Sequence, residues 1–134
     1  MLSRTWSVVL HGVESHTVEI EVDATGKGNE QRVSIVGLPD NSVRESRERI
    51  QSALNSSGFS LPGGHTTISL APADIKKSGS NFDLPMAIGI LSVRAGISTS
   101  LLQEFLIVGE LALGSFDSAS THVPICLQTM RRDF

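Results

Sequence analysis

The sequence contains little of what many specialised small proteins rely on. It has a single cysteine, Cys126, so no disulfide can form within the chain, and its four histidines show no spacing typical of a zinc site. Cys126 is therefore interpreted as a buried or incidental thiol. The apolar runs fall short of the roughly 18 residues that a membrane-spanning helix requires, and the N-terminus lacks the apolar stretch of a signal peptide. We expect a cytoplasmic protein with no membrane span, no metal and no other cofactor.

Positive charge is also scarce. The 134 residues include 11 basic and 14 acidic side chains, which gives a net charge of −3. A chain of this charge has no general attraction to a nucleic-acid backbone, so DNA binding would depend on a local basic patch. The glycine-containing segments 26–29 and 79–81 lack the G-x-x-x-x-G-K-[ST] layout that holds nucleotide phosphates. The chain by itself is not expected to bind ATP.

What is present is the pattern of an ordinary globular domain, with 40% apolar and 19% charged residues. Residues 17–23 alternate between apolar and acidic side chains, which predicts a strand with one wet face. Residues 6–10 predict a preceding strand, joined to it by a short turn as a hairpin. Residues 32–37 and 66–70 predict two further strands, and the apolar run 105–113 predicts a central strand.

A first helix is predicted between the third and fourth of these strands. Residues 40–42 are all candidate N-caps, and Ser42 with Glu45 forms a capping-box pattern. Gly58 is suited to end the helix. Its apolar side is made of Val43, Ile50, Ala53 and Leu54. On the opposite, exposed side Glu45 and Arg49 form a favourable i,i+4 pair.

A second helix is predicted over residues 84–93, which are apolar on nearly every side and so must be buried. Asp83 is the expected N-cap, and Gly96 is expected to end the helix. We expect this helix to be the centre of stability, with Ile88 and Ile90 both in the core. The predicted order of elements is strands, helix, strand, helix, strand, which is compatible with the α+β fold that the resemblance described below implies.

Five basic residues could contact an anion or a nucleic acid: Arg44, Arg47, Arg49, Lys76 and Lys77. They would form one patch only if the start of the first helix and the loop before the second lie at the same edge of the sheet. Glu45 and Glu48 alternate with the arginines and cancel much of their field, which favours a solvated helix face. No residue is assigned a catalytic or metal-binding role.

Three segments resemble a known family. They are Val-Gly-Leu-Pro-Asp at 36–40, the run Leu-Ala-Pro-Ala-Asp-Ile-Lys-Lys-Ser-Gly-Ser-Asn-Phe-Asp-Leu-Pro at 70–85, and Val-Gly-Glu-Leu-Ala-Leu at 108–113. In order and separation they are similar to the N-terminal domain of magnesium-chelatase-like AAA+ ATPases, the YifB/ComM group of bacterial competence proteins with a ChlI-like subunit domain.

The resemblance implies that residues 1–134 are a single domain of this kind. It is clear over residues 5–113, is lost over 114–122 and returns in part over 123–134. The domain is therefore expected to be truncated at its C-terminus.

The family domain implies a two-layer α/β sandwich, like the second domain of the fifth small-subunit ribosomal protein and the proteolytic domain of Lon. Lon-type proteases use a serine in a glycine-rich loop and a lysine further along the chain. The matching loop 79–83 places Asn81 at the serine position, and no lysine follows the loop. A local pair of Ser80 with Lys77 is all that remains of such a dyad.

In the family this domain precedes an AAA+ motor, and the group is associated with DNA processing during natural competence and with hexamer formation. The resemblance thus implies a non-catalytic regulatory or interaction domain, here without its motor. It also implies a protein partner or self-association in a ring, with DNA binding that is at most weak. A Lon-like serine peptidase and a weak nucleic-acid-binding module are the alternatives.

Overall fold

The computed structural model describes residues 2–96, 98, 100–111 and 130–131. The long strands are β1 (Leu2–His11), β2 (Glu14–Ala24), β3 (Gln31–Val36) and β4 (Gly64–Ala71), and the long helices are α1 (Asn41–Ser56) and α2 (Asp83–Ala95). The shorter elements are the 3-10 turn η1 (Leu102–Glu104), β5 (Phe105–Leu106) and β6 (Met130–Arg131). Cys126 and the stretch 114–122 lie outside the described residues.

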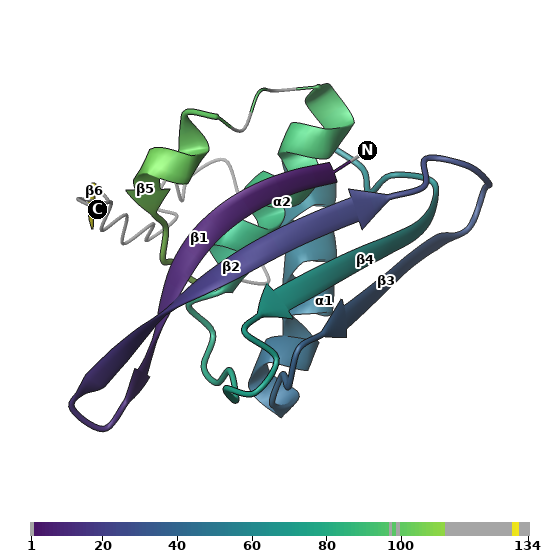
Figure 1. The fold of residues 1–134 in the computed structure, drawn as a ribbon. Helices are drawn as coiled ribbons and strands as arrows, with labels where there is room; N and C mark the ends of the chain where they lie inside the picture. The colour runs from purple at the N-terminus through teal and green to yellow at the C-terminus, as the bar shows by residue number, and fades with distance from the viewer. Residues whose placement is uncertain (1, 97, 99, 112–129, 132–134) are drawn as a thin grey trace, which may run out of the picture.

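The four long strands form one mixed sheet in the order β1-β2-β4-β3. β2 pairs antiparallel with both β1 and β4, whereas β3 runs parallel to β4. Both long helices lie on the same side of this sheet (Figure 1). Val18, Ile20 and Val22 of β2 face the helices and are fully buried, as the alternation predicts. The expected two-layer α+β fold is confirmed.

α1 begins and ends where the local sequence predicts. The first of the three candidate caps is the one used, because Asp40 Oδ1 accepts the N–H of Val43 at 2.8 Å. At the other end Gly58 takes a left-handed conformation with φ 82°, and the N–H of Phe59 returns to the carbonyl of Leu54 at 2.9 Å. This is the Schellman arrangement that a glycine after a helix favours.

α2 lies on the hairpin through hydroxyl groups as well as apolar contacts. Ser3 Oγ donates to the carbonyl of Gly89 at 2.7 Å, and Thr5 Oγ1 donates to that of Pro85 at 3.0 Å. Gly89 permits this close approach, since a Cβ there would lie 2.7 Å from Cγ2 of Val22. Two strand residues thus fix two successive turns of the helix against β1.

The first turn of α2 differs from the prediction. Asp83 is the first helical residue, and Phe82 occupies the N-cap position without a side-chain hydrogen bond. The expected role of Asp83 as N-cap is wrong, because its carboxylate binds groups from α1 and from residue 111 instead. The C-terminal prediction is confirmed, since Gly96 is left-handed with φ 66°.

The predicted central strand over residues 105–113 is also wrong for the part that the structure describes. β5 has only two residues, and residues 107–111 continue outside the four-stranded sheet. They dock beside β1, where the N–H of Ile107 donates to the carbonyl of Trp6 at 2.8 Å, and Ile107 is buried. An apolar run indicates burial, but it does not distinguish a central strand from a buried segment held by other contacts.

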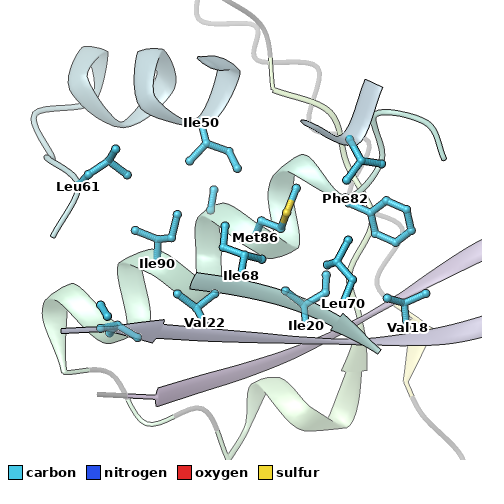
Figure 2. Packing of buried hydrophobic residues seen from close by; sticks show 14 of the residues in the cluster. Val18, Ile20, Val22, Ile50, Leu61, Ile68, Leu70, Phe82, Met86 and Ile90 are labelled. Atoms are coloured by element: carbon cyan, nitrogen blue, oxygen red, sulfur yellow. The ribbon is translucent and has the colours of Figure 1, made fainter. Parts of the chain in front are cut away.

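The core lies between the sheet and the helices. Figure 2 shows Met86 and Ile90 of α2 between Ile50 of α1 and Ile68 of β4. Ile90 is 1% exposed, as expected for the centre of stability. Ile88 is only partly buried, so its predicted place in the core is wrong, because the helix turns this residue toward the outer side.

Replacing Ile90 by alanine is expected to lower the free energy of unfolding by about 2–5 kcal/mol, because it deletes buried methylene groups and leaves a cavity. Ile88→Ala is the matched control on the same helix, and it should cost clearly less because its surroundings can relax. Urea denaturation followed by circular dichroism measures both. Equal losses would contradict the assignment of these two positions.

Candidate functional site at the loop end of the sheet

The first two of the segments that carry the family resemblance, 36–40 and 70–85, meet at one end of the sheet. We call this the loop end; it comprises the turn 36–40 after β3, the loop 72–82 after β4 and the hairpin turn 11–14 (Figure 1). The N–H of Lys77 donates to the carbonyl of Leu38 at 3.0 Å, and the N–H of Asp40 donates to the carbonyl of Lys77 at 2.9 Å. The start of α1 and the loop before α2 therefore lie at the same edge of the sheet.

The turn 36–40 has an unusual backbone. Gly37 has φ 106°, and a Cβ at this position would overlap the carbonyl oxygen of Leu70. Leu38 follows in the left-handed region with φ 55°, which is rare for a side chain of this size, and half of it is exposed. Gly37 is thus structural, as the glycine is the only residue type that fits without displacing β4.

A fully buried carboxylate joins the helices near this end. Asp83 accepts bonds from Ser46 Oγ, from Arg49 Nε at 2.6 Å and Nη2 at 3.0 Å, and from the N–H of Leu111 at 3.2 Å. We call Ser46, Arg49, Asp83 and the N–H of Leu111 the Asp83 cluster. The hydrogen bond to Asp83 raises the pKa of the Arg49 guanidinium above its ordinary value, against the opposing effect of burial.

The sequence analysis did not find the Asp83 cluster. It placed Arg49 on the exposed face with Glu45, whose carboxylate is 3.8 Å away, but only 14% of the Arg49 side chain is exposed. One signal was available, since Ser46 falls between Val43 and Ile50 on the buried stripe of α1. A buried serine one turn before an arginine indicates a polar contact inside the stripe.

Among the described residues, Lys77 is the other charged residue that is fully buried. Its side chain is fully buried, and Nζ donates to the carbonyl of Pro72. Burial lowers the pKa of Lys77, and the nearby carboxylate of Asp74 opposes this in part. The Lys77 amine makes the bond to Pro72 and none to Ser80 among the described residues. The Ser80–Lys77 pair considered above as a remnant of a catalytic dyad is therefore not formed.

The remaining basic candidates are exposed. Arg47 Nε donates to the carbonyl of Arg44 at 3.3 Å and Nη1 to that of Val33 at 3.4 Å. Lys76 is exposed, and its carbonyl accepts a bond from His11 Nε2 at 3.0 Å. Of the five predicted contact residues, the structure therefore leaves Arg44, Arg47 and Lys76 open to solvent, whereas Arg49 and Lys77 are bound internally.

Asn81, at the position that resembles the nucleophile of Lon-type proteases, also has a structural role. Its side-chain amide donates to the carbonyl of Val8 at 3.1 Å, and its own carbonyl accepts the N–H of Gly109 at 2.9 Å. Among the described residues no cluster of potential metal ligands occurs, and none of the helices in that part of the chain has the length and apolar character of a membrane span.

Comparison with known proteins identifies relatives of most of this chain. The family described as "Subunit ChlI of Mg-chelatase" matches residues 20–134. Competence protein ComM of Haemophilus influenzae is 42% identical over 113 residues, which are 84% of this chain and 22% of ComM. The uncharacterized protein YifB of Escherichia coli is 41% identical over 97 residues, or 72% of this chain and 18% of YifB. The chain thus spans about a fifth of the length of these relatives.

Removal of the buried carboxylate is expected to be costly. Asp83→Ala should lower the free energy of unfolding by about 3–5 kcal/mol, because it leaves the Arg49 charge without its partner in a buried position. Arg47→Ala is the matched control, and it should change stability by less than about 0.5 kcal/mol because the side chain is exposed. Denaturant titrations compare the two, and similar losses would contradict the role of the Asp83 cluster.

Proposed function

The chain belongs to the family of the ChlI subunit of Mg-chelatase, and we propose that it is a non-catalytic regulatory and interaction domain of an AAA+ ATPase of this kind. The observation that carries the proposal is that its buried charged groups are engaged in internal contacts. Asp83 and Arg49 bind each other between the helices, and Lys77 binds the carbonyl of Pro72. Groups held in this way stabilise the loops and are not free for proton transfer or nucleophilic attack.

ATP hydrolysis in such a protein is assigned to another domain. The sequence has no Walker-type glycine-rich segment followed by Lys and Ser or Thr. The peptidase alternative is weakened by Asn81 at the nucleophile position and by the Lys77 amine, which is bonded elsewhere.

The wider role proposed for this domain is in natural competence, because its relative ComM is named a competence protein. A domain without its own chemistry contributes by binding, so we propose that it contacts a protein partner or further copies of itself in a ring. It would thereby support the processing of incoming DNA by the complete ATPase.

Direct DNA contact is a second, weaker candidate function. It is favoured by the convergence of Arg44 and Lys76 at the loop end, where the turn before α1 and the loop before α2 are hydrogen-bonded. Arg47 lies on the same helix face one turn after Arg44. The net charge of −3 limits this patch to weak, non-specific binding.

Isothermal titration of the chain with ATP and Mg²⁺ is expected to show no saturable heat at physiological ATP concentrations, and the chain should release no phosphate from ATP. The reason is the lack of a backbone loop and lysine that could hold the β- and γ-phosphates together. Titration with Mg²⁺ alone serves as the blank. Stoichiometric ATP binding would overturn the proposed division between this domain and a separate motor.

Binding to a short DNA duplex, followed by fluorescence anisotropy, should be weak and should fall with salt. With two or three phosphate contacts the slope of log K against log salt is expected to be about −2 to −3. Lys76→Ala should reduce the slope by about one unit, whereas Lys27→Ala, in the loop between β2 and β3 at the opposite end of the sheet, should leave it unchanged. Tight binding that is insensitive to salt would contradict this account.

A further inference from the structure

The two edges of the sheet differ in what covers them. At the β1 edge the N–H of Ile107 donates to the carbonyl of Trp6, and Asn81 donates to the carbonyl of Val8, so residues of two other segments occupy its backbone groups. The β3 edge lies at the opposite side of the sheet (Figure 1). All six residues of β3 are exposed or only partly buried.

The backbone groups that β3 presents at this edge follow from its pairing. The N–H of Gly64 in β4 donates to the carbonyl of Glu30, the residue just before β3. The N–H and C=O groups of the even-numbered residues of β3 are therefore directed toward β4. Because alternate residues of a strand direct their N–H and C=O groups to opposite sides, Gln31, Val33 and Ile35 direct theirs outward. Such a row of outward groups is a template for another strand.

Among the described residues, Arg47 is the one whose side chain contacts this row of outward backbone groups of β3. From α1 it reaches the carbonyl of Val33 at 3.4 Å, near the upper limit of a hydrogen bond. A contact of this length, made by an exposed side chain, is weak enough for an incoming N–H to replace. In the part of the chain that the structure describes, the backbone groups of Ile35 make no hydrogen bond to a group outside the strands.

Charge decides which kind of strand fits. Within the described residues neither Arg44 nor Arg47 is in an ion pair, and neither is Glu48 of the same helix, while Glu45 pairs with Arg49 and Glu30 with Arg32. Among these side chains Arg47 is the one that contacts the outer edge of β3. A second copy of β3 would bring two sets of these arginines together, and like charges across a strand pair are destabilising. A strand with acidic side chains would instead form an ion pair with the Arg47 guanidinium, once this group has left the carbonyl of Val33.

We propose that the outer edge of β3 is a strand-addition site for an extended acidic segment of a partner protein. The partner strand forms main-chain hydrogen bonds with Gln31, Val33 and Ile35. One of its carboxylates takes Arg47 from the carbonyl of Val33 and binds its guanidinium. The inference rests on the interaction role proposed above and gives that role a surface and a partner chemistry.

The test uses a blocked hexapeptide of alternating glutamate and valine, and the readout is amide hydrogen exchange by NMR. At about 90% occupancy the amides of Val33 and Ile35 should exchange about tenfold more slowly, because exchange then proceeds through the free fraction. The amides of Arg32 and Ser34, which already face β4, are internal controls and should not change. A peptide that is N-methylated at alternate residues should give no protection.

Charge reversal tests the choice of partner. Arg47→Glu should weaken binding of the glutamate peptide by about fivefold and favour the corresponding lysine peptide. Arg94→Glu, a reversal at the far end of α2, should leave both affinities unchanged.

Two outcomes would overturn the proposal. One is that Val33 and Ile35 show no change with the peptide at millimolar concentration, or are already protected in the free chain. The other is equal binding of the glutamate and lysine peptides. Either result leaves the non-catalytic role standing, because that role is tested separately by the ATP titration.

Discussion

The buried contact between Asp83 and Arg49 is the constraint on which the arrangement of the helices depends. A carboxylate with no exposed surface is tolerated only when its oxygens are fully bonded. Here the bonds come from two residues of α1 and from the backbone of residue 111. The direction of α2, its distance from α1 and the position of the segment after β5 are therefore set together.

The hydroxyl contacts between β1 and α2 place this helix pair on the sheet. Ser3 and Thr5 bond to carbonyls one helical turn apart, and Gly89 lets the helix approach the hairpin closely. At the loop end the backbone of Lys77 bonds to both sides of the turn 36–40. The polar groups of the family-like segments thus mainly hold the fold together. The basic groups that remain open to solvent lie at the surface, at the margin of the domain near the beginning of α1.

That margin is where an interaction domain would make its contacts. Arg44, Arg47 and Lys76 are exposed near the beginning of α1, and Arg47 contacts the outer edge of β3. The β1 edge is occupied by Asn81, which precedes α2, and by Ile107, which follows it, so the two edges of the sheet differ. The β1 edge binds other segments of the same domain, and the β3 edge presents backbone groups outward. A rigid sheet with one open edge suits a domain whose contribution is binding.

Local patterns in the sequence determined most of the secondary structure. The alternation in β2, an N-cap among residues 40–42 and the glycines that end both helices each depend on a few neighbouring residues, and each is present as predicted. The family-like segments also carried the family assignment, since the matched residues include all of them. The class of fold followed from the family resemblance, and the order of these elements is compatible with it.

The tertiary structure decided which partner each buried polar group binds and which apolar residues lie in the core. The sequence could not show that the Asp83 carboxylate binds Arg49 and does not cap α2. The two residues are 34 positions apart and meet only when the helices pack. Nor could it separate Ile88 from Ile90 in a helix that is apolar on nearly every side, or distinguish residues 105–111 from a central strand. Apolar character determines that a segment is buried; which partner buries it depends on contacts between segments distant in the chain.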